Sequence, residues 1–294
     1  MKQLNLRSAT VVITGASSGI GKAAALAFAR EGANIVLASR NEAVLQEVAK
    51  ECEAFGGQAL ALETDVTDKT SVQELLKNAL SFFGKVDVWV NNAGVGAVGE
   101  FTKTPLEVHE QVIRTNLLGP LYGSYFALEY FLEQQRGIII NSNSTGAYVG
   151  APFSVGYSAS KFGFRGLSEA LRYELKTHPD VHVCDIFAPF VDTPAFEHAA
   201  NFIGKELKPA PPLLSPVAYA NAMVALAKKP KPVLRLGVND RAARLAHALV
   251  PNFMGEIMNR LERSYFRRAK NKVLTSGNLF RPPAEENHIT GGHA

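Results

Sequence analysis

Short apolar runs alternate with amphipathic segments along most of this chain. Residues 34–38 and 137–141 are apolar on both faces of an extended chain, as a parallel sheet covered by helices on two sides requires. Between such runs, apolar residues recur at helical spacing, as in 24–28 and 44–48. The pattern predicts seven strands, at about 9–14, 34–38, 58–63, 86–91, 136–142, 181–187 and 232–237. Because this alternation favours right-handed crossovers, we expect an α/β fold with a doubly wound parallel sheet.

Three stretches depart from the alternation. Residues 189–216 contain six prolines and predict a long, mostly irregular loop with a short helix. Residues 240–272 show helical spacing of apolar residues, and eight Lys/Arg against three Asp/Glu make them basic. Residues 275–294 are rich in Gly, Pro and polar side chains, which predicts an extended or disordered arm. We therefore divide the chain into a body, 1–240, which includes the loop 189–216, and a helical C-terminal extension with a tail, 241–294.

The basic amphipathic segment 240–272 has three interpretations. Packing against the body or a dimer partner is favoured, because an apolar face of this size needs burial. A cap over the substrate entrance comes next. A helix on a membrane surface, attracted by anionic lipid, is the least favoured. The apolar face contains Leu245, Leu249, Phe253, Ile257 and Leu261.

Composition narrows the classes of partner. The 294 residues are 47% hydrophobic, enough for a sizeable core, and a formal net charge of +4 is too small to argue for a nucleic-acid partner. The two cysteines, Cys52 and Cys184, and the seven histidines show no spacing typical of metal ligands. We therefore expect reduced thiols and no metal site. Residues 1–7 lack the apolar core of a signal peptide, and no run of about 18 apolar residues exists. We therefore expect a cytoplasmic protein.

A glycine-rich motif follows the first predicted strand. Residues 14–21 read Thr-Gly-Ala-Ser-Ser-Gly-Ile-Gly and open the first predicted helix. The glycines at 15, 19 and 21 permit a tight turn and let the backbone approach a pyrophosphate at the helix N-terminus. In this context the motif predicts a dinucleotide site.

The end of the second predicted strand bears on the choice of cofactor. An NAD site usually places an acidic residue there, but residues 38–41 read Ala-Ser-Arg-Asn. This stretch has no carboxylate that would repel a phosphate, and the Arg40 guanidinium could pair with a phosphate. We therefore favour NADP(H) and leave NAD(H) open. Arg40 could instead stack on the adenine or face solvent. Asp65 and Val66, after the third predicted strand, are placed to contact the adenine edge.

Tyr157 and Lys161 stand four residues apart, on one face of a predicted helix. A phenol is a poor acid at neutral pH, and a nearby ammonium lowers its pKa. Ser144 lies thirteen residues before Tyr157 and can hydrogen-bond a substrate oxygen. Together with a dinucleotide site, these residues indicate hydride transfer to or from a carbonyl.

The combined motifs resemble those of the short-chain dehydrogenase/reductase family over roughly residues 5–240. The matching positions are the glycine motif 14–21, Asn-Asn-Ala-Gly at 91–94, Asn116, Ser144, Tyr157 and Lys161. The resemblance implies a Rossmann fold and a Tyr157 that acts as general acid and base. It also implies that Lys161 holds the nicotinamide ribose and that Asn116 supports a proton relay to that lysine.

The resemblance further implies which residues contact the cofactor. Two departures from the family pattern matter. Gly146 follows Ser144 by two residues where the family has three, so Ser142 is an alternative to Ser144 as the catalytic serine. Phe190 replaces the glycine of the family's Pro-Gly pair and adds bulk beside the expected nicotinamide. The implied contact residues are Gly15, Ser17, Ser18, Gly19, Ile20, Ser39, Arg40, Asp65, Val66, Asn92, Ala93, Gly94, Tyr157, Lys161, Pro189, Val191 and Thr193.

We therefore predict an NADP(H)-dependent oxidoreductase acting on a lipophilic carbonyl/secondary-alcohol pair. Helices near 116–131 and 157–175 resemble the family's dimer-forming pair, which implies a homodimer or homotetramer. The alternative is an NADP(H)-binding sensor or regulatory protein with little turnover, although a sensor would not need all four matched catalytic residues. The lipophilic preference rests on apolar walls that favour such substrates over sugars. Those walls are Val95, Val98, Phe101, Tyr148, Val149, Phe153, Phe190 and Phe196.

Overall fold

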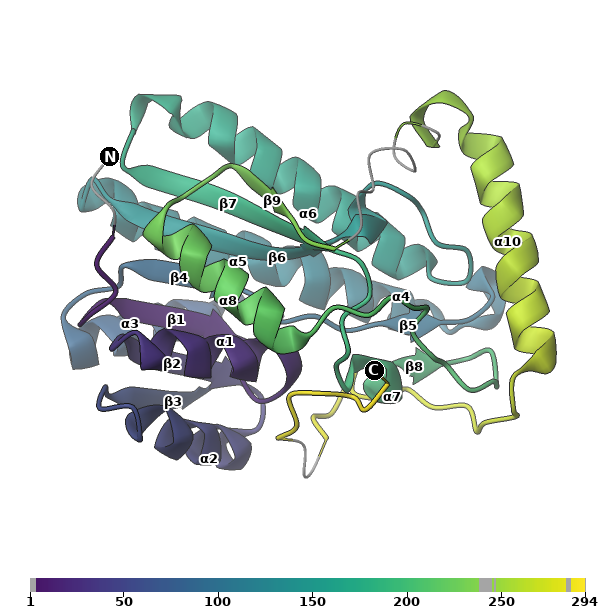
Figure 1. The fold of residues 1–294 in the computed structure, drawn as a ribbon, viewed down its shortest axis with the longest axis horizontal. Helices are drawn as coiled ribbons and strands as arrows, with labels where there is room; N and C mark the ends of the chain where they lie inside the picture. Colours follow the sequence, from purple (N-terminus) through teal and green to yellow (C-terminus); the bar gives the residue numbers. More distant parts are fainter. Residues whose placement is uncertain (1–3, 238–244, 246, 284–286, 294) are drawn as a thin grey trace.

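A seven-stranded parallel sheet forms the centre of the molecule, in the order β3-β2-β1-β4-β6-β7-β9 (Figure 1). The computed structural model describes residues 4–237, 245, 247–283 and 287–293. All seven predicted strands are confirmed, each within two residues of its expected bounds. They are β1 (Thr10–Thr14), β2 (Asn34–Ser39), β3 (Ala59–Glu63), β4 (Val88–Asn91), β6 (Gly137–Ser144), β7 (Val181–Ala188) and β9 (Val233–Arg235).

Helices cover both faces of the sheet (Figure 1). They are α1 (Gly19–Arg30), α2 (Glu42–Glu53), α3 (Lys69–Phe83), α4 (Leu106–Ile113), α5 (Gly119–Glu133), α6 (Val155–Glu174) and α8 (Pro216–Lys228). Successive residues of a strand point to opposite faces of the sheet. Val11 and Ile13 pack in one hydrophobic cluster with α1 and α8, and Val12 packs in the other with α3 and α5. This double burial is why the strands read as unbroken apolar runs.

The strand order reverses between β1 and β4. From β1 the chain builds outward through β2 and β3, and then returns to add β4, β6, β7 and β9 on the other side. The carboxyl ends of β1 and β4 therefore face a crevice at the point of reversal, where ligands bind in folds of this type. The predicted doubly wound sheet is confirmed, and its geometry places the glycine motif at this crevice.

A second, two-stranded sheet was not predicted. It pairs β5 (Ala97–Val98) in parallel with β8 (Ala200–Asn201), and two residues are too few to show a strand pattern in sequence. The predicted irregular loop 189–216 contains β8 and one short helix, α7 (Ala195–His198).

The C-terminal extension contains α10 (Pro251–Arg268), which lies along one edge of the molecule (Figure 1). None of its residues is buried. It contacts the body through the Phe266 ring, 5.3 Å from that of Phe153, and through the Tyr265 hydroxyl, which donates to the Glu206 carbonyl at 2.8 Å. Phe253 and Leu261 stay exposed. Much of the predicted apolar face is therefore exposed in one subunit, and its burial against a dimer partner stays a prediction.

Part of the predicted segment 240–272, including residues 240–244 and 246, lies outside the described residues. Among the helices that the structure describes, none is long and apolar enough to cross a membrane. Cys52 and Cys184 are free and buried, and burial raises the pKa of each thiol to about 12.

Candidate active site

A glycine-rich turn joins β1 to α1 at the carboxyl edge of the sheet. Gly15 has a φ of 67°, which favours glycine, and a Cβ there would lie 2.8 Å from the Cα of Ala93. A Cβ on Gly21 would collide with the Gly15 carbonyl. The Asn92 amide donates to the carbonyls of Thr14 and Gly15, at 3.1 and 3.2 Å. Close packing against the end of β4 therefore requires glycine at both positions.

A pocket at the carboxyl ends of β1 to β4 gathers most of the predicted cofactor residues. Those that line it are Gly15, Ser17, Ser18, Gly19, Ile20, Ser39, Arg40, Asp65, Val66, Asn92, Ala93, Gly94 and Thr193. Four predicted positions do not line it: Tyr157, Lys161, Pro189 and Val191. Val191 is instead buried and bridges to Leu214.

Arg40 lines the pocket directly after β2. Burial lowers the pKa of its guanidinium below the ordinary value, and nearby Asp65 opposes that shift. One carboxylate oxygen of Asp65 accepts hydrogen bonds from the amide and hydroxyl of Thr67, at 2.9 and 2.8 Å. Asp65 is therefore held in place by its own turn, at the wall where the adenine edge was expected.

The C-terminal tail also reaches this pocket. Asn278, Pro282 and Pro283 line it, and the Arg40 guanidinium donates to the carbonyls of Asn278 and Leu279, at 2.6 and 2.9 Å. The sequence predicted an extended or disordered arm, and nothing in its composition pointed to these contacts. The tail is extended, but it is docked against this pocket.

Tyr157 and Lys161 lie one turn apart on α6, as predicted. The Lys161 ammonium is 5.7 Å from the centre of the Tyr157 ring, and it donates to the Ser142 carbonyl at 3.3 Å. Lys161 is buried, and burial lowers its pKa to about 8, an effect that Asp185 opposes. A buried ammonium therefore stands beside the phenol.

The pKa of Tyr157 differs from the expectation. Burial of its hydroxyl raises the pKa above the ordinary value, and a hydrogen bond with Ser144 only partly offsets this. Desolvation penalises the phenolate, so burial of the hydroxyl opposes the lowering that Lys161 and an oxidised nicotinamide are predicted to cause. A pKa above the ordinary value keeps the proton on the phenol at neutral pH.

The two candidate serines have different partners. The Ser144 hydroxyl contacts Tyr157 and accepts from the Gly146 amide at 3.1 Å. The Ser142 hydroxyl is 3.0 Å from that of Tyr219. Side chains alternate along a strand, so these two serines share a face of β6, and Ser144 stands at the carboxyl end of the strand beside Tyr157. The geometry favours Ser144 over Ser142.

Asn116 is fully buried in an irregular, π-type turn between α4 and α5. Its amide oxygen accepts from the Val95 amide at 2.8 Å, and its amide nitrogen donates to the Val95 carbonyl at 2.9 Å. It also donates to the Ser160 hydroxyl at 3.3 Å. These contacts join the backbone that leaves β4 to α6, the helix that carries Tyr157.

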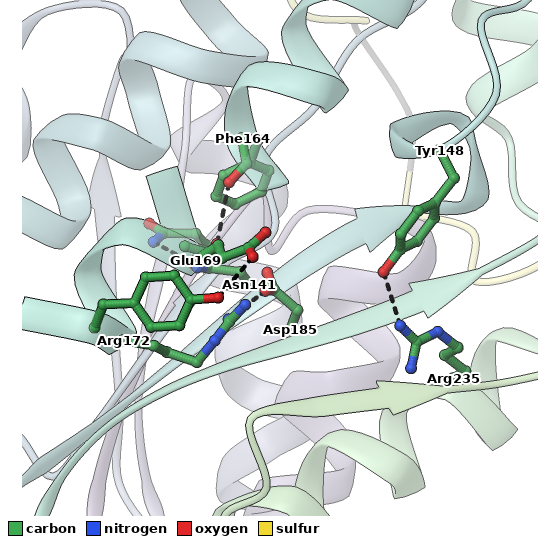
Figure 2. A network of polar contacts seen from close by, with 10 residues as sticks. Asn141, Tyr148, Phe164, Glu169, Arg172, Asp185 and Arg235 are labelled. Atoms are coloured by element: carbon green, nitrogen blue, oxygen red, sulfur yellow. Dashed lines mark hydrogen bonds and ion pairs between the residues drawn. The ribbon is translucent and has the colours of Figure 1, made fainter. Parts of the chain in front are cut away.

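Buried polar contacts hold α6 against the sheet (Figure 2). Asn141 on β6 donates to the Ser168 hydroxyl at 2.8 Å, and Arg172 pairs with the fully buried Asp185 of β7 at 2.5 Å. Burial raises the pKa of Asp185, and Arg172 opposes this. The helix that carries Tyr157 is therefore bonded to two strands rather than held by apolar packing alone.

The predicted substrate walls divide into two groups. Val95 lines the pocket and Phe153 is buried against α10. Phe101 and Phe190 are exposed, and Phe190 leans on Phe196 with ring centres 5.7 Å apart. Phe190 does not line the pocket at the ends of β1 to β4, and its effect beside the expected nicotinamide stays a prediction.

The fold and the glycine turn define the class: an α/β protein of the Rossmann type with its crevice at the strand reversal. The family model described as short chain dehydrogenase matches residues 9–202. The chain belongs to the short-chain dehydrogenase/reductase family of oxidoreductases.

Known relatives extend the likeness beyond the family match. The uncharacterized oxidoreductase YxnA of Bacillus subtilis is 33% identical over 266 residues, 89% of this chain and 74% of the relative. The 3beta-hydroxysteroid dehydrogenase 1 of Eggerthella lenta is 34% identical over 220 residues, 74% of this chain and 83% of the relative. Among solved structures, an alcohol dehydrogenase from Thermococcus sibiricus complexed with 5-hydroxy-NADP has a TM-score of 0.68 at 31% identity, and the match covers 78% of this chain and 96% of that one.

Proposed function

We propose that this protein is an NADP(H)-dependent oxidoreductase that transfers a hydride between nicotinamide and a carbonyl or secondary alcohol. One observation carries the proposal: the Ser144 and Tyr157 hydroxyls are in contact, and the Lys161 ammonium lies 5.7 Å from the Tyr157 ring. A proton donor, a group that orients the substrate oxygen and a stabilising cation are thereby assembled. They sit at the sheet edge that also carries the glycine turn.

The pocket fits a dinucleotide on grounds of its own. A Cβ at Gly15 or Gly21 would fill space against backbone, so the turn presents backbone at close range, as a pyrophosphate needs. Arg40 follows β2, where an NAD site usually has a carboxylate. A bound nicotinamide supplies or accepts the hydride. We infer a preference for the phosphorylated cofactor, with NAD(H) still open, and the solved relative with 5-hydroxy-NADP supports it.

Proton transfer falls to this chain's own residues. In carbonyl reduction Tyr157 gives its proton to the substrate oxygen, which the Ser144 hydroxyl holds in place, and in alcohol oxidation it takes the proton back. The nearby Lys161 ammonium stabilises the phenolate that forms, which is the state that burial penalises. We infer that the lysine also binds the ribose, and that Asn116 supports the relay that returns the proton.

Replacing Arg40 with Ala should weaken NADPH binding about tenfold or more, because a charge-assisted contact to the 2′-phosphate is worth roughly 1.5–3 kcal/mol. NADH binding should change little. Titration of both cofactors by fluorescence measures the two dissociation constants. Arg40→Lys is the matched variant, which keeps the charge without the planar fork. Equal losses for NADPH and NADH would mean that Arg40 contacts the adenine or supports the fold instead.

We infer a lipophilic substrate. Tyr157 packs against a cluster of apolar side chains that includes Val95 and Val112. The relative from Eggerthella lenta is named for a 3β-hydroxysteroid, an apolar secondary alcohol. A panel of ring ketones, long-chain ketones and sugars, with NADPH consumption as the readout, tests the proposal. Turnover of apolar ketones supports it. Tight NADPH binding without turnover of any compound would favour the sensor or regulatory protein.

We also propose a homodimer or homotetramer. Apolar side chains on α5 and α6 are exposed, including Leu121, Tyr125 and Phe162. Helices of this pair meet across subunits in the resembled family, and burial would remove these side chains from water. Light scattering of the protein in solution measures the molar mass, which distinguishes a monomer from a homodimer or homotetramer.

A further inference from the structure

The C-terminal chain returns from α10 across the cofactor side of the body. It is drawn in yellow in Figure 1, where it passes β8 and α7. We call residues 275–283 and 287–293 the strap. At its start, Thr275 and Asn201 of β8 exchange two backbone hydrogen bonds, at 2.8 and 3.1 Å, and so extend the small sheet. Leu279 is fully buried in the cluster that includes Val95 and Val112. The strap is therefore anchored by both pairing and apolar burial.

The middle of the strap meets the end of β2. The backbone carbonyls of Asn278 and Leu279 accept hydrogen bonds from two nitrogens of the Arg40 guanidinium. The Pro283 carbonyl accepts one from the side-chain amide of Asn41 at 3.0 Å. Arginine has five N–H donors, so two such bonds orient the guanidinium and leave donors for a ligand. Carbonyl acceptors are neutral, so the strap aims the guanidinium without cancelling its positive charge.

The end of the strap meets the glycine turn and the loop after β7. The His288 carbonyl accepts from the Gly19 amide at 2.8 Å, in the first turn of α1. The Asn287 carbonyl accepts from the Lys22 ammonium at 2.9 Å, and the His293 amide donates to the Asp192 carboxylate at 2.9 Å. The strap thus contacts three separate segments around one pocket: the start of α1, the end of β2 and the loop after β7.

The path of the strap depends on glycine. Gly277 has a φ of 55°, and a Cβ there would collide with the backbone of His198 and Ala199. A Cβ on Gly291 would lie 2.5 Å from the Thr193 carbonyl oxygen. At both glycines the strap backbone lies too close to the body for a side chain, so the strap is packed tightly against the body and its sequence is compatible with that packing.

We propose that the strap is part of the cofactor site: it positions Arg40 for the 2′-phosphate and encloses the adenosine half of NADP(H), so that the cofactor leaves only when the strap detaches. Asn278 and Leu279 are positioning residues that act through Arg40. This inference rests on the proposed function, since it assumes that NADP(H) is the ligand.

Gly277→Ala tests the proposal in the full-length protein, because it blocks the docked path without touching Arg40. The matched control is Gly255→Ala on α10, where a Cβ meets nothing within 4 Å. We expect Gly277→Ala to raise the NADPH dissociation constant and release rate about tenfold, measured by cofactor fluorescence and stopped-flow displacement. NADH should be affected less, and the control should match the wild type. Leu279→Ala, which removes the buried anchor, should act in the same direction.

Hydrogen exchange on the unmodified protein provides a readout that does not depend on a variant folding. NADPH should slow amide exchange in residues 275–281 along with that of the glycine turn. Wild-type NADPH binding and release in Gly277→Ala, or strap amides that exchange equally with and without NADPH, would overturn the proposal and leave the proposed function standing. Failure of the wild type to bind NADP(H) would overturn both.

Discussion

Tyr157→Phe is expected to lower kcat for carbonyl reduction by at least about 100-fold, the range of general acid catalysis. The substitution removes only the hydroxyl, which is the group in contact with Ser144. NADPH binding should stay within a few fold, because Tyr157 does not line the cofactor pocket. Steady-state kinetics with an apolar ketone and a separate NADPH titration measure the two effects.

Tyr173→Phe serves as the matched control. Tyr173 lies on the same helix but is exposed, and its hydroxyl donates to Glu169 one turn away. Its loss should leave kcat unchanged. If Tyr157→Phe keeps more than about a tenth of the wild-type rate, well short of the loss expected for a general acid, Tyr157 is not the proton donor.

Lys161→Met should lower kcat by about 100-fold while keeping most of the side-chain volume. A unit charge 5.7 Å away stabilises a phenolate by about 3 kcal/mol at an effective dielectric constant of about 20, and about 1.4 kcal/mol is a factor of ten. In the wild type, reduction should slow as pH rises through about 8, where Lys161 loses its charge. The variant's rate should lack this step in its pH profile.

Lys161 should also make the free energy of unfolding depend on pH. Its pKa is about 8 in the folded protein against an ordinary 10.5, so between these pH values the unfolded chain holds a proton that the folded chain has released. The wild-type free energy of unfolding should therefore rise with pH in this window, relative to Lys161→Met, by up to about 3 kcal/mol. Near pH 7 the variant should be the more stable protein, because it carries no buried ammonium.

Denaturant unfolding at several pH values measures this difference, and Lys176→Met, at an exposed lysine just beyond α6, is the control. A variant that loses activity and also loses stability at pH 7 would show that the ammonium supports the fold. A variant with wild-type kcat would remove Lys161 from the mechanism.

The sequence alone determined the layered fold and the position of the crevice. Each central strand is a local apolar run because it is buried on both faces, and that property is visible within a few consecutive residues. The glycine motif and the Tyr157–Lys161 pair are also local, since each is recognised by spacing within one turn or one helix. For this reason the order of residues along the chain was enough to identify them.

Only the tertiary structure decided how the site is closed and supported. The choice of Ser144 over Ser142 depends on which hydroxyl meets Tyr157 and which meets Tyr219. The contact of Arg40 with the strap joins residues more than 200 positions apart. The pKa of Tyr157 depends on how far its hydroxyl is removed from water, a quantity that no spacing encodes. These features arise from packing between distant segments, and hydrophobic periodicity records only which face of a segment is buried, not what buries it.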